Sequence, residues 1–311
     1  LNPAHRLWAD GRWNKITLAH GCYWKKCSFC DVKLDYIGHY EAAPIAGLVD
    51  HMERLVEETG QRGFHFVDEA APPKLLRDLA IELLRRDLQI SMWGNIRFEK
   101  SYDPDLCRLL GAAGLIAVTG GLEVANERLL EKIDKGVSVE QVARAAEAFQ
   151  SAGIMVHAYL MYGFPTQTLQ ESIDSMELVR QLFAEGLLSS AFWHRFVLTR
   201  HAPIFDRPAD FGVQLEGGRG TEAKAFAQND VPHTDPSGGN HDLFDRVLPL
   251  ALESWLQGRE LQRPVHTWFT ESLPVSTEPP TRVALALGNA AGTPKRGRLL
   301  WLGGEPLESE H

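Results

Sequence analysis

The stretch that decides the fold lies near the start of the chain, at residues 15–31, and reads KITLAHGCYWKKCSFCD. Its first five residues, 15–19, form a β-rich run, and three of the four cysteines of the chain follow within nine residues. A loop that follows a strand in a β/α protein lies at the end of the sheet where active sites are built. The cysteine loop therefore marks the place to look for chemistry.

Outward from this loop, short β-rich runs alternate with amphipathic segments six times before the chain changes character near residue 200. Most runs are apolar on both faces, as expected for parallel strands that helices cover. The six runs span residues 15–19, 63–67, 88–93, 115–119, 154–161 and 191–198. Six successive β/α units predict an α/β fold, either a partial (β/α)6 TIM-type barrel or a doubly wound open sheet.

Prolines and caps mark the starts of the intervening helices. One helix begins at Pro44, a second at Pro72 and Pro73, and a third at Asp103 and Pro104. The first two are expected to run to about residues 59 and 86, and two more helices are expected at about residues 138–151 and 167–184.

The last third of the chain has a different character. Residues 199–240 are rich in Pro, Gly, Asp and His without a sustained period, which indicates an irregular excursion over the barrel end. A helix is expected at about residues 242–257, and the apolar runs 282–288 and 298–303 suit a β-hairpin. We therefore expect a barrel over residues 1–200 and a C-terminal extension over residues 201–311.

Composition places the 311-residue chain among ordinary globular proteins, with 44% hydrophobic and 23% charged residues. There are 32 Lys and Arg against 41 Asp and Glu, and the net charge of −9 argues against a nucleic-acid partner. No apolar run reaches the length of a membrane span and no signal peptide precedes the first strand, so a cytoplasmic protein without a membrane partner is expected. Because the chain begins with Leu1 rather than Met, we also expect an upstream domain.

The clustering of Cys22, Cys27 and Cys30 points to metal rather than to disulfides. Three thiolates can hold three irons of a [4Fe–4S] cluster and leave the fourth iron open to a ligand that is not protein. Alternatively, His20 or a remote histidine completes a zinc site in a β/α interaction module. A third interpretation keeps the cluster as an electron-transfer or sensing centre. Cys107 lies inside an amphipathic helix, where a small buried hydrophobe is its expected role.

These residues resemble the radical S-adenosylmethionine (radical SAM) superfamily, whose signature is three cysteines on the loop after the first strand of a partial (β/α)6 barrel. The usual spacing is Cys-x3-Cys-x2-Cys, whereas four residues separate Cys22 from Cys27. Phe29, before the last cysteine, keeps the aromatic character that packs near adenine in the family. The resemblance implies a [4Fe–4S] cluster on the three cysteines, which are then the catalytic residues. It also implies S-adenosylmethionine on the open iron and its reductive cleavage to a 5′-deoxyadenosyl radical.

The resemblance also implies roles for polar residues that follow the later strands. Asp68 and Glu69 stand where the family meets the ammonium group of methionine, although both could instead cap the helix that follows. Asn95 and Arg97 follow the third run, and Arg97 either steadies a carboxylate or forms a salt bridge with Glu99 or with a neighbouring helix. Both interpretations of Arg97 stay open.

Two later sites complete the set implied by the resemblance. Glu123 is expected to meet the ribose hydroxyls, and Gly163 and Pro165 form a Gly-x-Pro turn beside the adenine. His194 on the sixth run either faces the substrate or is an ordinary structural histidine.

The motifs Asp68-Glu69 and Gly121-Leu122-Glu123 look most like the branch that often carries a cobalamin-binding domain ahead of the barrel. Such a domain would lie upstream of Leu1, and cobalamin-dependent methyl transfer is then one reaction to expect. The resemblance further implies a small-molecule substrate and an electron donor such as a flavodoxin or a ferredoxin.

Overall fold

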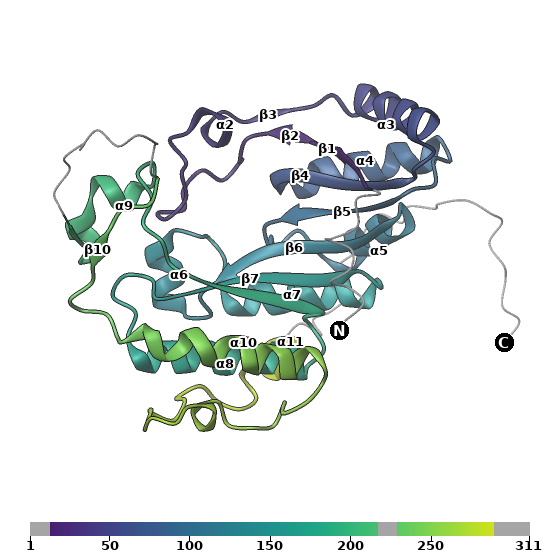
Figure 1. The fold of residues 1–311 in the computed structure, drawn as a ribbon. Coiled ribbons are helices and arrows are strands. Elements are labelled where there is room, and N and C mark those ends of the chain that lie inside the picture. Colours follow the sequence, from purple (N-terminus) through teal and green to yellow (C-terminus); the bar gives the residue numbers. More distant parts are fainter. Residues whose placement is uncertain (1–12, 217–228, 289–311) are drawn as a thin grey trace, which may run out of the picture.

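The computed structural model describes residues 13–216 and 229–288, and a six-stranded sheet lies at its centre (Figure 1). All neighbouring strands are parallel, and their order in the sheet follows their order in the chain. The strands are β1 (Asn14–Ile16), β4 (Gly63–Ala71), β5 (Ser91–Ile96), β6 (Leu115–Glu123), β7 (Met155–Tyr162) and β8 (Ser190–Arg195). A doubly wound sheet would reverse its strand order at a switch point, so the sequential order confirms the partial TIM-type barrel.

Helices connect the strands, and most begin at the predicted residues. Asp103 caps α5 by accepting a hydrogen bond from the Leu106 amide at 2.8 Å. The helices of the barrel are α3 (Ile45–Thr59), α4 (Pro73–Arg85), α5 (Pro104–Ala112), α6 (Glu127–Ile133), α7 (Val139–Ser151) and α8 (Leu169–Ala184). Within the described ranges, no helix is long and apolar enough to cross a membrane.

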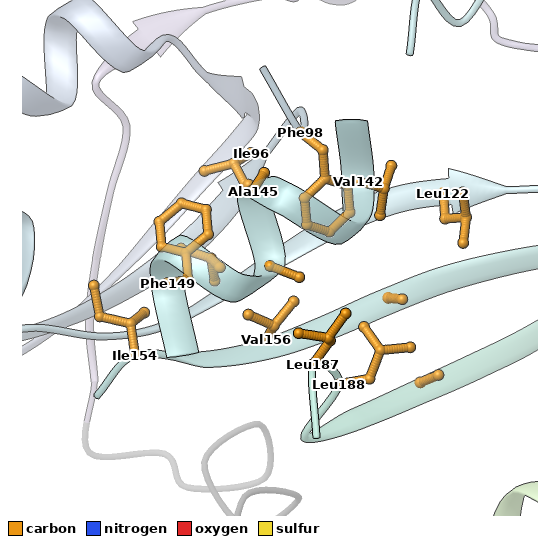
Figure 2. Packing of buried hydrophobic residues seen from close by; sticks show 14 of the residues in the cluster. Ile96, Phe98, Leu122, Val142, Ala145, Phe149, Ile154, Val156, Leu187 and Leu188 are labelled. Carbon is orange, nitrogen blue, oxygen red and sulfur yellow. The ribbon is translucent and has the colours of Figure 1, made fainter. Parts of the chain in front are cut away.

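The core lies between the sheet and this layer of helices. Alternate residues of each strand, such as Phe64 and Phe66 of β4, point to the helices and are almost fully buried. Figure 2 shows Val156 of β7 packed among Phe149 and Ala145 of α7. The residues between them in the strands point to the opposite, concave face of the sheet.

The chain after β8 packs onto the barrel instead of leaving it. The excursion contains a short helix, α9 (Pro203–Asp206), and a two-stranded ladder of β9 (Gln214–Leu215) with β10 (His233–Thr234). Helix α10 (Phe244–Leu256) then lies along α8 and contacts β8 (Figure 1). The helix predicted at about residues 242–257 is therefore confirmed.

The predicted C-terminal hairpin is wrong in its first half. Residues Arg282–Gly288 form a helix, α11, that contacts α7 and α8. Val283 and Ala286 are buried while Leu285 is 59% exposed, a spacing of three that belongs to a helix. An apolar run of seven residues fits either state by sequence, and packing against two helices decided between them. The second run, 298–303, lies outside the described residues.

Candidate cluster-binding site

The cysteine loop leaves the carboxyl end of β1, as predicted, and returns through a small antiparallel ladder of β2 (Ala19–His20) with β3 (Glu41–Ala42). Gly21 has a φ of 69°, and a Cβ there would lie 2.1 Å from the carbonyl oxygen of His39. Only glycine permits this close approach. The Cys22 amide then donates to the Ile37 carbonyl at 2.9 Å, so the first cysteine is fixed by backbone contacts.

The three thiols are half-buried and lie close enough to influence one another. Burial raises the pKa of Cys30 to about 12, and the charges of Cys27 and Cys22 add to that rise. Burial also raises the pKa of Cys27. Metal binding must therefore displace protons from these thiols, because the thiolate is the ligand.

The donor set distinguishes between the two kinds of metal site considered from the sequence. A single zinc ion needs donors that converge on one point. Among residues 13–216 and 229–288, no three His, Cys, Asp or Glu side chains are grouped so that they could hold one metal ion. A four-iron cluster gives each thiolate its own iron, so the thiols need not converge. Three neighbouring thiols on one loop fit the cluster, and His20 is not grouped with them around one point in the described part of the chain.

A buried ion pair stands beside the thiols. The ammonium of Lys135 donates to Glu123 Oε1 at 2.7 Å, and both side chains are buried. Lys135 also lies 5.9 Å from the centroid of the Phe29 ring, and its charge lowers the pKa of Cys27 against the larger effect of burial. Glu123 has a φ of 63°, an unusual backbone conformation for a residue with a side chain. Lys135 was not chosen from the sequence, although the pair Lys135-Gly136 follows the same strand as Glu123.

The two acidic residues after the second run differ in burial and in their partners. Asp68 is 2% exposed, and its carboxylate accepts hydrogen bonds from the amides of Leu18 at 3.0 Å and Ala19 at 2.8 Å. Burial raises the pKa of Asp68 in spite of these bonds. Glu69 is exposed and near enough to Cys30 to raise the pKa of that thiol. Neither residue makes a capping bond to α4, since the N-cap is Pro72.

Asn95 and Arg97 are engaged with protein groups. Asn95 accepts a hydrogen bond from the Thr119 hydroxyl and donates to the carbonyl oxygen of Asp68 at 2.9 Å, so it links three adjacent strands. Arg97 is 4% exposed and donates to the Glu99 carboxylate and to the Lys135 carbonyl oxygen. Of the two interpretations of Arg97, the pair with Glu99 is the one that the structure shows.

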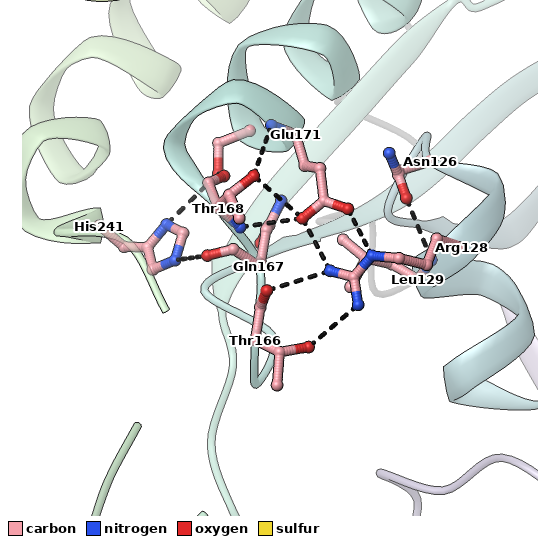
Figure 3. A network of polar contacts seen from close by, with 9 residues as sticks. Asn126, Arg128, Leu129, Thr166, Gln167, Thr168, Glu171 and His241 are labelled. Carbon is pink, nitrogen blue, oxygen red and sulfur yellow. Dashed lines mark hydrogen bonds and ion pairs between the residues drawn. The ribbon is translucent and has the colours of Figure 1, made fainter. Parts of the chain in front are cut away.

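The Gly-x-Pro turn after β7 leads directly into the start of α8. Figure 3 shows Arg128 bonded to Thr166, and it shows His241 of the C-terminal extension beside Gln167. The Gly163 amide donates to Gln167 Oε1 at 2.7 Å, and Pro165 is buried. His241 Nε2 lies 3.0 Å from the Gln167 carbonyl oxygen. Thr168 and Glu171 form a capping box at the N-terminus of α8.

Phe29 of the cysteine loop packs against a second hydrophobic cluster, and Phe164 of the turn belongs to the same cluster. The loop is also tied to the chain beyond β8. The Ile204 amide donates to the Ser28 carbonyl at 3.1 Å, and Asp31 accepts from Thr199 and from Asn229. The rim thus brings the three cysteines together with Phe29, Glu69, Arg97 and Glu123, while Asp68 bonds to the backbone just before the cysteine loop.

Comparison with protein families gives a match that covers half of the chain. The family model described as the Radical SAM superfamily matches residues 16–179. An uncharacterized methyltransferase of Pyrococcus horikoshii is 23% identical over 58% of this chain and 40% of its own. An anaerobic magnesium-protoporphyrin IX monomethyl ester cyclase of Rubrivivax gelatinosus is 30% identical over 52% of this chain and 29% of its own. The chain thus spans less than half the length of these curated relatives.

Solved structures show the same fold. The radical S-adenosylmethionine methyltransferase TsrM of Kitasatospora setae, with tryptophan substrate and a SAM analogue bound, matches with a TM-score of 0.59 and 19% identity. The match covers 91% of this chain and 59% of TsrM. The cobalamin-dependent S-adenosylmethionine radical enzyme OxsB, with aqua-cobalamin bound, matches with a TM-score of 0.55 and 12% identity over 78% of this chain and 41% of its own.

Proposed function

The chain belongs to the radical SAM superfamily, and from this premise we propose that Cys22, Cys27 and Cys30 hold a [4Fe–4S] cluster whose fourth iron binds S-adenosylmethionine. It is an enzyme of this class, and the cluster and S-adenosylmethionine are the cofactors of the family. The observation that carries the proposal is the arrangement of three half-buried thiols at the carboxyl end of β1, beside a buried Lys135–Glu123 pair. The zinc-binding module is set aside because neither the donor set nor the family supports it.

When bound, the cluster and S-adenosylmethionine together supply one-electron cleavage of the sulfonium to methionine and a 5′-deoxyadenosyl radical. The chain's own residues bind and orient the cofactor. Glu69 is the exposed carboxylate near Cys30 and is proposed to accept the ammonium group. Glu123 is proposed to accept from the ribose hydroxyls while Lys135 holds its carboxylate in place. Phe29 and the turn at Gly163 and Pro165 are proposed to flank the adenine, while Asp68, Asn95 and Arg97 support the rim from behind.

The test is anaerobic. The protein is reconstituted with iron and sulfide, supplied with dithionite and S-adenosylmethionine, and assayed for 5′-deoxyadenosine. We expect the wild-type chain to form it and Cys30→Ala to reduce the yield at least a hundredfold, because the cluster loses one ligand. Cys107→Ala is the matched control, since Cys107 is fully buried inside α5 and is not part of the cysteine loop.

The outcomes separate the interpretations. A Cys30→Ala protein that still cleaves S-adenosylmethionine would contradict the proposed ligand set. A wild-type protein that holds the cluster without cleaving S-adenosylmethionine would favour the electron-transfer or sensing centre instead.

We further propose that the net reaction is methyl transfer to a small molecule, with cobalamin as a second cofactor and a flavodoxin or ferredoxin as the electron donor. The relatives support this assignment, because one is named as a methyltransferase and TsrM and OxsB were solved with cobalamin bound. The proposed upstream domain would supply the cobalamin site, next to a barrel over residues 1–200. Full-length protein given cobalamin, a low-potential reductant that brings it to cob(I)alamin, and S-adenosylmethionine with a labelled methyl group should yield labelled methylcobalamin and S-adenosylhomocysteine. Its absence from protein that still forms 5′-deoxyadenosine would overturn this assignment.

A further inference from the structure

We infer that Trp24 and Arg97 are positioning residues that set the separation of Cys22 from Cys27, an inference that rests on the proposed cluster. The segment between these cysteines has one residue more than the usual spacing. The longer segment must be held in one shape if both thiols are to serve the same cluster. Side chains hold it here, from two neighbouring loops of the barrel rim.

Trp24 is held on three sides. The guanidinium carbon of Arg97 lies 3.8 Å from the centroid of the Trp24 ring, which is a close cation–π contact. The indole Nε1 of Trp24 donates to the carbonyl oxygen of Asp134 at 2.7 Å. A Cβ on Gly136, whose φ is 69°, would lie 2.2 Å from the ring. The loop after α6 therefore binds the indole of Trp24, and Gly136 stands where the ring comes closest to the backbone of that loop.

Arg97 joins the cysteine loop to the rest of the rim. Its side chain donates to the Glu99 carboxylate and to the carbonyl oxygen of Lys135 while its face covers Trp24. The hydroxyl of Tyr23 donates to Glu99 Oε1 at 2.8 Å. Two consecutive residues of the cysteine loop are thus fixed by one buried arginine and its carboxylate partner. A planar guanidinium can donate to two acceptors and stack on a ring at the same time, which the compact ammonium of a lysine cannot do.

The backbone turns at the next residue. Lys25 has a φ of 57°, the left-handed conformation, and the chain then runs to Cys27. Because Tyr23 and Trp24 are fixed to the rim, this turn starts from a defined position. The same arginine holds the backbone of Lys135, whose ammonium lies on the Cys27 side of the site. Arg97 therefore places both the long cysteine segment and the charge that faces it.

The experiment compares four variants after anaerobic reconstitution with iron and sulfide. Trp24→Ala and Arg97→Gln remove the contact, Trp24→Phe keeps an aromatic face but loses the Nε1 donor, and Trp268→Ala is the matched control. Trp268 makes the same kind of contact with Arg263, at 4.1 Å, in the segment that packs on α8. The readouts are iron and sulfide per chain and the electron paramagnetic resonance spectrum of the reduced cluster, with and without S-adenosylmethionine.

We expect Trp24→Ala and Arg97→Gln to bind at least threefold less iron and to lose the spectral change on adding S-adenosylmethionine. Trp24→Phe should recover at least half of the iron, and Trp268→Ala should match the wild type. Melting of the unloaded proteins distinguishes a misplaced loop from an unfolded chain. If Arg97→Gln does not fold, the two Trp24 variants still test the inference, because Trp24 is only half-buried.

Wild-type iron content and an unchanged spectrum in Trp24→Ala would overturn the inference. This result is distinguishable from a failure of the proposed function by adding Cys30→Ala to the series. Loss of the cluster in Cys30→Ala with retention in Trp24→Ala would overturn the positioning role alone. Retention of the wild-type cluster in both variants would overturn the ligand set as well.

Discussion

A single buried residue, His241, shows how the fold fixes a protonation state beside the rim. It is 7% exposed, with Nε2 3.0 Å from the Gln167 carbonyl oxygen and Nδ1 3.4 Å from the Ser172 hydroxyl. Burial lowers the pKa of His241 below its ordinary value of about 6.5, so the folded chain holds the ring neutral. The positive charge of Arg195 acts in the same direction.

This direction predicts how stability depends on pH. The unfolded chain binds a proton on His241 at a higher pH than the folded chain does, so the free energy of unfolding falls as the pH drops through about 6.5. We expect His241→Gln to make that fall smaller, while His65, whose pKa burial also lowers, keeps part of it. Urea unfolding of the unloaded proteins from pH 8 to pH 5 measures the difference. Equal slopes for the two proteins would contradict the prediction.

Adjacent residues show what the sequence can predict at this scale. The pair Asp68 and Glu69 could be placed at the rim from its position after a strand. Which carboxylate is open depends on the pleat, because consecutive residues of a strand point to opposite faces. Asp68 lies on the buried side and accepts from the backbone of Leu18 and Ala19, just before the cysteine loop, whereas Glu69 is exposed. For Arg97 the sequence offered Glu99 as one of two alternatives, but it did not indicate Lys135 or Trp24, which lie in separate segments of the chain.

At the scale of an element, α11 gives a test that distinguishes a helix from a strand. Val283 is 1% exposed and Leu285 is 59% exposed, although an alternating strand would put both on the same face. Val283→Ala should lower the free energy of unfolding by about 2 kcal/mol through lost burial and a small cavity. Leu285→Ala should change it by less than about 0.5 kcal/mol, as expected for an exposed position. Thermal denaturation measures both, and similar losses would mean that this segment does not pack as a helix.

The long strands and helices could be predicted from the sequence, whereas the short elements could not. The six strands and the longer helices follow from hydrophobic period, proline starts and caps. Helix α6 has seven residues, too few to show a period, and it was missed together with Lys135 just after it. The β2–β3 ladder has two residues on each side and is set by tertiary contact alone. Helix α6 and the β2–β3 ladder flank the cysteine loop, so the surroundings of the site were harder to predict than the barrel.

At the scale of the whole molecule, the extension after residue 200 shares the core of the barrel. Phe244 and Trp255 of α10 and Val283 of α11 belong to the same buried cluster as Phe66 of β4 and Val156 of β7. We therefore propose that the barrel and the described part of the extension unfold as one unit. Native-state hydrogen exchange should give amides of α10 the same opening free energy as those of β6 and β7. A separate, lower opening free energy for α10 would show that the extension unfolds on its own.

The contacts that shape the cysteine loop join residues that are far apart in the chain, and this affects the order in which the protein folds. Tyr23 bonds to Glu99, Trp24 to Asp134 and Asp31 to Asn229, over 76, 110 and 198 residues of chain. Contacts between such distant residues close late, because each must first overcome the entropy of the intervening chain. A chain still being made on the ribosome has its three cysteines long before it has the residues that arrange them. We therefore expect the proposed cluster to be inserted at the end of biosynthesis, after the barrel has folded around its own first loop.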